Sequence, residues 1–215
     1  MFPERLTKGY RAFLEGRFAV ERGRYQSLAG SGQRPSIMVI GCVDSRVSPE
    51  VIFDAAPGEL LVARNVANLV PRYEAPTTSE NDISHQHGTS AALEFAVRAL
   101  KVRHIVVLGH AFCGGIKAFA SDEAPLTASD FIGRWMRQIA PAAEAIGPRD
   151  GEGEEGYLRK LEFASVELSL KNLMSFPFVK AAVETGELDL HGAYFGVASG
   201  RLLVRDRRTG QFEPV

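Results

Sequence analysis

The fold of this chain is decided by residues 36–46, whose sequence is SIMVIGCVDSR. Its first five residues form a short, mostly apolar run, which is typical of a strand buried on both faces of a parallel sheet. Polar chemistry follows directly after the run, where Cys42, Asp44 and Arg46 alternate. In an open α/β sheet, ligands bind beyond the carboxyl ends of the strands. The stretch therefore predicts a parallel sheet and the edge at which its site lies.

A second strand end carries matching chemistry. The apolar run Ile105–Leu108 leads to His110 and to Cys113, which with Cys42 makes up the chain's two cysteines. Two thiolates and one imidazole are a ligand set for Zn²⁺, and a fourth position without a protein ligand is typical of a catalytic zinc. Copper is the main soft competitor. The alternative, that both cysteines are buried apolar residues, leaves His110 and the polar residues after Cys42 unexplained.

The neighbours of Cys42 are expected to control the site. Two thiolates neutralise the charge of the ion, so hydroxide is expected to form on it only at somewhat alkaline pH. Asp44 either accepts a hydrogen bond from that hydroxide or binds zinc itself and closes the site. Arg46 is placed to hold the Asp44 carboxylate in a bidentate ion pair and keep it off the metal. The alternative is a salt bridge that only stabilises the turn.

The other apolar patterns alternate between strands and helices, which indicates an α/β fold with a mostly parallel central sheet. The predicted strands are Ser36–Gly41, Leu60–Ala63 and His104–Gly109, followed by a C-terminal strand pair, Leu188–Val197 and Leu202–Arg207. The predicted helices are one or two in Pro3–Leu28, one capped by Ser48 and ended by Pro57 and Gly58, one capped by Thr89, then Gly114–Ala120, Thr127–Ile146 with a kink at Pro141, Leu158–Met174 and Phe178–Thr185. Pro71–Gly88 is predicted to be a polar connection and Asp150–Gly156 an acidic surface loop.

We expect one domain over residues 1–215, with residues 1–30 as an N-terminal helical dimerisation arm. That arm carries aromatic residues before the first strand and has no strand partner of its own. Packing on a second subunit is the favoured interpretation, and a monomer with the arm folded back is the alternative.

Composition narrows the function classes. Hydrophobic residues make up 45% of the 215 residues, charged residues 24%, and the formal net charge is −1. That balance is typical of a globular protein and argues against nucleic acid as a partner.

No apolar run approaches the ~20 residues that cross a bilayer, so no membrane partner is expected. Residues 1–6 lack the pattern of a secretory signal. A cytoplasmic location is predicted, in which two cysteines are expected to be metal ligands or nucleophiles rather than partners in a structural disulfide.

The site residues fall into two motifs. They are Cys42, Asp44, Ser45 and Arg46 in the first, and Gly109, His110, Cys113, Gly114 and Gly115 in the second. The pair resembles the motifs of bacterial-type β-class carbonic anhydrases, and Arg64–Asn68 is similar to that family as well. The resemblance runs from about Gln33 to Gly200. It implies zinc-hydroxide attack on CO2 to give bicarbonate and a proton, on a homodimer or dimer of dimers whose subunits exchange N-terminal helices.

The resemblance also assigns roles. It puts one Zn²⁺ per chain on Cys42, His110 and Cys113, with Asp44 and Arg46 as the catalytic pair. The positions that match substrate-binding residues of the family are Gln33, Leu61, Val66, Phe95 and Gly114. Some members have an inhibitory bicarbonate site with a tryptophan three residues before the first cysteine. Val39 stands there in this chain, so that site is not expected, although Arg64 and Tyr194 match its other members.

Two other functions fit the motifs. One is a carbon disulfide or carbonyl sulfide hydrolase on the same fold, since those substrates are also linear and apolar. The other is a non-catalytic zinc or redox module in which Cys42 and Cys113 form a disulfide after metal loss. Among the remaining histidines, His85 and His87 are candidates for a proton shuttle or bystanders, and His104 and His191 are expected to be structural.

Overall fold

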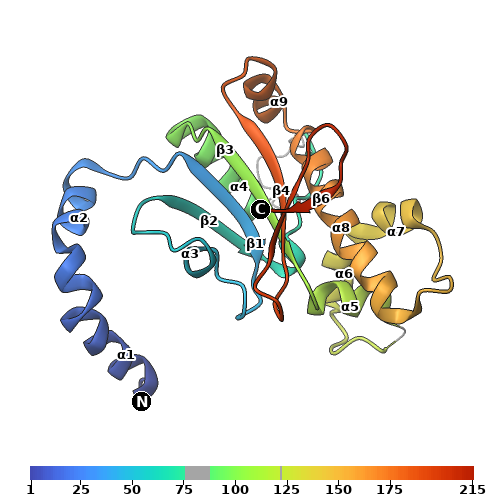
Figure 1. The fold of residues 1–215 in the computed structure, drawn as a ribbon, viewed down its shortest axis with the longest axis horizontal. Coiled ribbons are helices and arrows are strands. Elements are labelled where there is room, and N and C mark those ends of the chain that lie inside the picture. The colour runs from blue at the N-terminus through green and yellow to red at the C-terminus, as the bar shows by residue number, and fades with distance from the viewer. Residues whose placement is uncertain (76–87, 122) are drawn as a thin grey trace.

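A six-stranded sheet with the order β2-β1-β3-β4-β5-β6 forms the centre of the structure (Figure 1). The structure is a computed structural model that describes residues 1–75, 88–121 and 123–215. The strands are β1 (Ile37–Cys42), β2 (Leu60–Asn65), β3 (His104–His110), β4 (Asp189–Phe195), β5 (Leu202–Arg205) and β6 (Phe212–Pro214). The first four strands run parallel, and β5 and β6 add antiparallel partners at one edge. The predicted α/β class is confirmed.

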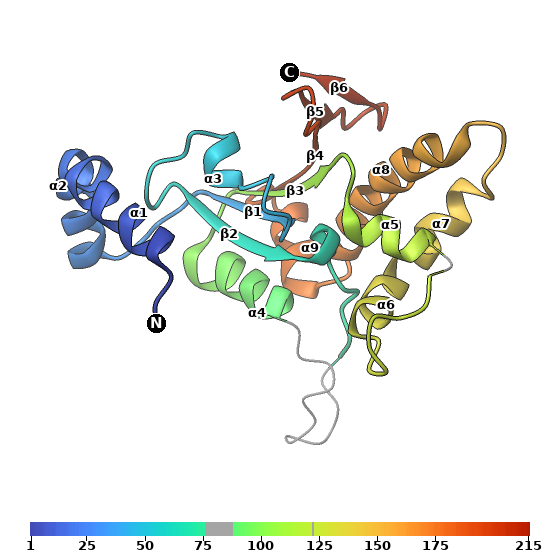
Figure 2. The same cartoon turned by 90° about the horizontal axis from the view of Figure 1, so that it is seen from below.

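Helices flank both faces of the sheet (Figure 2). They are α1 (Glu4–Glu15), α2 (Arg17–Ser31), α3 (Pro49–Ile52), α4 (Gly88–Glu94), α5 (Gly114–Ala120), α6 (Phe131–Met136), α7 (Ala140–Ile146), α8 (Gly153–Leu173) and α9 (Pro177–Glu184). Two short 3-10 segments, η1 (Val66–Asn68) and η3 (Arg137–Ile139), and a π-helical segment, η2 (Phe95–Leu100), complete the order. None of the helices in the described ranges is long and apolar enough to cross a membrane.

Both faces of the central strands are buried, as the apolar runs predict. On one face, Met38 and Ile105 pack with residues of α4, α8 and α9. On the other face, Val39 and Leu108 pack with the region of α3. Each fully buried side chain of this kind contributes about 1.5–3 kcal/mol of hydrophobic free energy. The two faces together fix β1 and β3 side by side, and these two strands carry the site.

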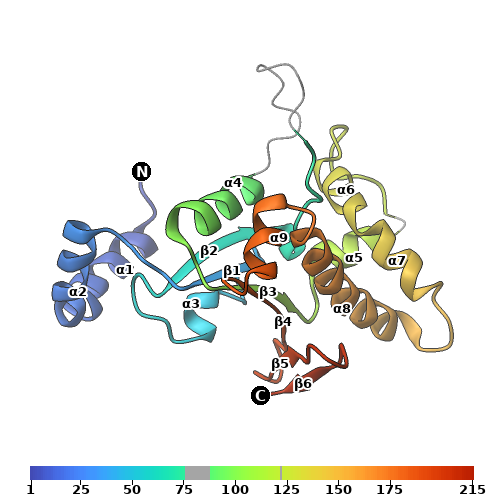
Figure 3. The same ribbon diagram turned by 90° about the horizontal axis from the view of Figure 1, so that it is seen from above.

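Helices α1 and α2 extend away from the body of the molecule (Figures 1 and 3). Neither helix has a buried residue, and Leu6 and Tyr10 are 54% and 60% exposed. Two arginines of α2 fasten it to the body, since Arg17 Nη2 donates to Ala55 O at 3.1 Å and Arg24 Nε donates to Pro57 O at 2.6 Å. Among the residues that the structure describes in one chain, the exposed apolar side chains of this arm therefore have no partner on the body.

Three boundaries predicted for the helices were wrong. The helix predicted from Thr127 begins at Phe131, where the Asp130 carboxylate caps it by accepting from Gly133 N at 3.1 Å. It is interrupted by η3, before Pro141 rather than at it. The helix after Ser48 ends at Ile52, well before Pro57.

Two further predictions needed correction. The loop predicted at Asp150–Gly156 is helical from Gly153, because α8 begins there. Thr89 lies inside α4 rather than capping it, and its Oγ1 accepts from Asn65 Nδ2 at 3.0 Å.

The predicted C-terminal strand pair is confirmed, since β4 and β5 are antiparallel neighbours. Strand β4 also pairs in parallel with β3, and the antiparallel edge is completed by β6, which the sequence analysis did not predict.

Gly109 of β3 lies directly against Val166 of α8, and its substitution by alanine tests that contact. An added Cβ would lie 2.6 Å from Val166 Cγ2. We expect Gly109→Ala to lower the free energy of unfolding by about 1–3 kcal/mol through overpacking, measured by urea denaturation. Combining it with Val166→Ala should recover part of that loss. Gly23→Ala in α2 is the control and should be neutral or stabilising, because an added Cβ there would have no neighbour within 4 Å among the described residues beyond its own helix backbone.

Candidate metal centre

Three potential metal ligands converge at the carboxyl ends of β1 and β3. Cys42 ends β1 and His110 ends β3, and the two strands are hydrogen-bonded neighbours in the sheet. Cys113 stands directly before α5, as its N-cap residue. One donor atom from each side chain lies within 4.8 Å of the other two, and all three residues are buried. The sheet thus gathers the predicted ligand set.

The proton arrangement of His110 suits a metal ligand. Its Nδ1 lies 2.9 Å from Ala111 O, a carbonyl that can only accept, so Nδ1 carries the proton and Nε2 has the lone pair. Nε2 is buried and has no hydrogen-bond partner within the described part of the chain. Buried polar atoms without a partner are rare, and a lone pair of this kind is suited to bind a ligand. Two thiolates with one imidazole nitrogen fit Zn²⁺, and the Nδ1 contact is the outer interaction typical of metal-bound histidine.

The two cysteines compete for one proton. A hydrogen bond from the Cys113 thiol lowers the pKa of Cys42, and the same contact together with burial raises the pKa of Cys113. Burial disfavours a charged His110, but its contact with Cys42 raises the pKa of His110 on balance. A divalent cation would relieve this competition, because it stabilises both sulfurs as thiolates.

The expected ion pair between Asp44 and Arg46 is present beside the ligands. Arg46 Nε donates to Asp44 Oδ1 at 2.9 Å and Nη2 donates to Oδ2 at 2.7 Å. The backbone N–H of Arg46 also donates to Oδ1, and Nη2 reaches Phe112 O at 3.0 Å. The hydrogen bonds from Arg46 hold the pKa of Asp44 well below its usual range. The carboxylate is therefore ionised at neutral pH and fixed in orientation.

Arg64 fastens the loop that carries Cys42 and Asp44. Its Nε donates to Cys42 O at 2.7 Å and its Nη2 donates to Asp44 O at 2.7 Å. Tyr194, the other residue matched to an inhibitory site, donates its hydroxyl to Glu162. Val39 is buried in the core. Each of these residues therefore has a structural contact of its own.

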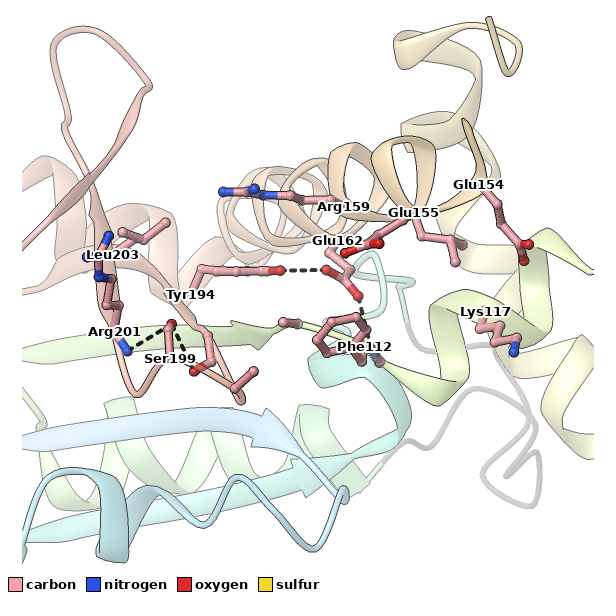
Figure 4. Close-up of a pocket in the computed structure, with 15 residues that line it drawn as sticks. Phe112, Lys117, Glu154, Glu155, Arg159, Glu162, Tyr194, Ser199, Arg201 and Leu203 are labelled. Atoms are coloured by element: carbon pink, nitrogen blue, oxygen red, sulfur yellow. Dashed lines mark hydrogen bonds between the residues drawn. The ribbon is translucent and has the colours of Figure 1, made fainter. Parts of the chain in front are cut away.

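Glu162 is a buried carboxylate that sequence reasoning missed (Figure 4). Its Oε1 accepts from Cys113 N at 3.0 Å, and its Oε2 accepts from the Tyr194 hydroxyl at 2.6 Å. Burial raises the pKa of Glu162 despite these two donors, and burial also raises the pKa of Tyr194. The sequence did carry a signal for its burial, because Glu162 has helical spacing with Ser165, Val166 and Ser169, which are buried on the same face of α8. Glu162 fixes the backbone at the second cysteine.

A cavity of about 800 Å³ opens beside this contact (Figure 4). Its walls include Phe112, Cys113, Glu162 and Tyr194, with Arg159 and Arg201 further out. Phe112 adopts a positive φ of 58° between the histidine and cysteine ligands, a backbone conformation that bulky residues rarely adopt. Strain of this kind clusters at functional sites.

Comparison with known proteins agrees with this geometry. A family model described as carbonic anhydrase matches residues 37–202. Beta carbonic anhydrase 3 of Arabidopsis thaliana is 35% identical over 200 residues, covering 92% of this chain and 74% of the relative. The chain belongs to the β-carbonic anhydrase family.

Solved structures of the family superpose closely on the chain. The β-carbonic anhydrase CcaA gives a TM-score of 0.80 at 27% identity, covering 99% of this chain and 91% of that one. A tetrameric β-carbonic anhydrase of the ascomycete Sordaria macrospora gives 0.75 at 30% identity, covering 93% and 94%. The chain is therefore a carbonic anhydrase by family and by fold.

The substrate-binding positions implied by the family lie in different places. Val66 packs in the cluster that contains Cys42 and Cys113, and Gly114 directly follows Cys113. Leu61 lies at the level of Met38 in the sheet and packs in another cluster. Phe95 is 46% exposed on η2, and Gln33 is exposed before β1. One chain alone brings together two of the five positions.

The candidate proton-shuttle residues, His85 and His87, lie outside the described residues. Their role stays a prediction from the sequence.

Removing the Glu162 carboxylate should damage the ligand loop. In Glu162→Ala, the Cys113 N–H and the buried Tyr194 hydroxyl lose their acceptor, and each unsatisfied group costs about 1–3 kcal/mol. We expect a lower melting temperature and faster loss of zinc to a chelator. Glu155→Ala, an exposed carboxylate on the same helix, is the control. Zinc retention equal to that of the unmodified chain would contradict the role given to Glu162.

Proposed function

We propose that this protein catalyses the reversible hydration of CO2 to bicarbonate and a proton, with one Zn²⁺ per chain bound by Cys42, His110 and Cys113. The observation that carries the proposal is the buried His110 Nε2, which faces two cysteines and has no hydrogen-bond partner in the described residues. Zinc in such a set supplies the Lewis acidity that makes water nucleophilic, here at somewhat alkaline pH because two thiolates reduce the charge of the ion.

Asp44 and Arg46 orient the reaction in this proposal. The ionised Asp44 accepts a hydrogen bond from the attacking water and so directs a lone pair of that water at the carbon of CO2. Arg46 engages both carboxylate oxygens, at 2.9 and 2.7 Å, and keeps Asp44 from rotating onto the metal. Because hydrogen bonding to Arg46 keeps the pKa of Asp44 low, Asp44 acts as an acceptor and not as a proton donor. The proton released by hydration leaves to buffer.

A second copy of the chain completes the substrate pocket in this proposal. Val66 supplies one apolar wall at the ligands, whereas Gln33, Leu61 and Phe95 do not join that wall within one chain. The unpartnered apolar face of α1 and α2 is suited to pack on the partner. The tetramers of the Sordaria macrospora relatives agree with assembly by this family. We also propose a cytoplasmic location, since reduced thiols are needed for zinc binding.

Two substitutions separate metal binding from catalysis. Cys42→Ser should lose zinc, because serine does not offer a thiolate. Asp44→Asn should keep zinc and lose about 10²–10⁴-fold in turnover, because the amide is a poor substitute for the ionised acceptor. Zinc content is measured by mass spectrometry, and CO2 hydration by stopped flow from about pH 7 to about pH 9.

Asp150→Asn, at an exposed carboxylate, is the matched control and should be fully active. Full activity of Asp44→Asn would refute the role of Asp44. Absence of CO2 hydration in fully zinc-loaded protein would refute the proposed function, and assays with carbon disulfide and carbonyl sulfide in parallel would then identify the substrate.

The arm offers a separate test of assembly. Leu6→Asp with Tyr10→Asp places two charges on its exposed apolar face. We expect the double variant to lower the molar mass in solution toward the 23.4 kDa of one chain, measured by light scattering after gel filtration. Lys8→Gln, on the same helix but exposed and paired with Glu4, is the control. An unchanged mass in the double variant would show that the arm does not hold the subunits together.

A further inference from the structure

A second cluster of potential metal ligands lies at the opposite ends of β3 and β4. His104 begins β3 and Asp189 begins β4, and the parallel register pairs them directly. His191 follows two residues after Asp189, so the alternation of a strand puts both on one face of the sheet. One donor atom from each of the three side chains lies within 4.8 Å of the other two. His104 and His110 are six residues apart on β3, which separates the two clusters by about 20 Å.

The distances within the cluster match those between ligands of one ion. His191 Nε2 lies 3.2 Å from His104 Nδ1, and His104 Nδ1 lies 3.8 Å from Asp189 Oδ2. Two nitrogens bound to tetrahedral zinc at about 2.05 Å are roughly 3.3 Å apart. The two nitrogens share a hydrogen bond at this distance, and since His191 Nε2 accepts, His104 Nδ1 donates. The imidazoles therefore already have the required spacing, and binding a metal requires the His104 proton to move from Nδ1 to Nε2 and the carboxylate to shift by about half an ångström.

Arg207 fixes the proton state of one imidazole and the orientation of the carboxylate. Its Nη1 donates to Asp189 Oδ1 at 2.8 Å, and its Nη2 lies 3.4 Å from His191 Nε2. A guanidinium only donates, so Nε2 is the acceptor and is unprotonated, and its lone pair becomes available to a metal when Arg207 moves away. Asp189 thus gives one oxygen to Arg207 and leaves the other facing His104. Outer partners orient metal-binding carboxylates in this way.

We propose that His104 Nδ1, Asp189 Oδ2 and His191 Nε2 bind a divalent first-row transition ion, with Zn²⁺, Ni²⁺ and Cu²⁺ as the class. Two imidazoles and one carboxylate oxygen suit these ions, whereas Mg²⁺ and Ca²⁺ require more oxygen ligands. The side chains of His104 and Asp189 are 41% and 50% exposed, so the ion can enter and water can complete its coordination.

Arg207 opposes binding, because its positive charge lies beside the ligand atoms. Its side chain is 57% exposed, so the guanidinium can leave His191 while it keeps Asp189. The bound ion would join β3 to β4 and stabilise the folded chain by mass action. The site is weaker than the catalytic one, since it lacks thiolates. It gives His104 and His191 a role beyond the structural one expected from the sequence.

Equilibrium dialysis of the zinc-loaded enzyme against added Zn²⁺ tests the site. We expect a second equivalent of zinc per chain and a higher melting temperature when that equivalent is bound. His104→Asn and His191→Asn should each raise the dissociation constant of the second zinc at least tenfold and leave the first zinc bound. Arg207→Gln should lower the dissociation constant of the second zinc roughly fivefold, because removal of one exposed charge interaction has about that effect. With Cu²⁺ as the probe, electron paramagnetic resonance should report nitrogen and oxygen ligands.

The chain has five histidines, so the double variant His85→Asn with His87→Asn is the control for ions bound by other imidazoles. It should keep the second equivalent. Absence of a second equivalent, its persistence in His104→Asn and His191→Asn, or its loss in the control would overturn the proposal. If His104→Asn and His191→Asn fail to fold, Arg207→Gln is the deciding variant. An unchanged affinity of this variant for the second zinc would then overturn the proposal.

Discussion

The parallel pairing of β1 with β3 is the constraint on which the site depends. The register that places Gly41 opposite Leu108 makes Cys42 and His110 leave the sheet at the same edge. That pairing is stable because both faces of the two strands are buried. It also imposes a local requirement, since β3 passes so close to Val166 of α8 that Gly109 has no room for a side chain. The packing that stabilises the two strands therefore also positions the candidate ligands.

Side-chain hydrogen bonds to the backbone hold the loops that follow β1 and β3. Arg64 binds the carbonyls of Cys42 and Asp44, and Glu162 binds the N–H of Cys113. Each bond acts on a ligand loop rather than on a ligand atom, so the sulfurs stay free for a metal. Buried carboxylates are costly unless they are paired, and Glu162 meets that cost with two donors. The network explains why a charged residue occupies the buried face of α8.

Strand β3 carries candidate metal ligands at both ends. At its carboxyl end, His110 adjoins two cysteines and an ionised aspartate. At its amino end, His104 lies 3.2 Å from His191 and beside Asp189, both on β4. The first cluster is buried and rich in sulfur, and the second is partly exposed and has only nitrogen and oxygen donors. The two clusters therefore differ in the ions they favour and in how readily solvent reaches them.

The sequence alone predicts the parallel strands, the candidate ligands and the pair of Asp44 with Arg46. These features are local, because an apolar run or a spacing of a few residues indicates them without any distant contact. The order of the sheet and the hydrogen bonds of Glu162 became known from the tertiary structure. Those depend on contacts between segments far apart in the chain, as between Cys113 and Glu162, and periodicity carries no information about which distant segments meet. The juxtaposition of His104 with His191, 87 residues apart, is of the same kind.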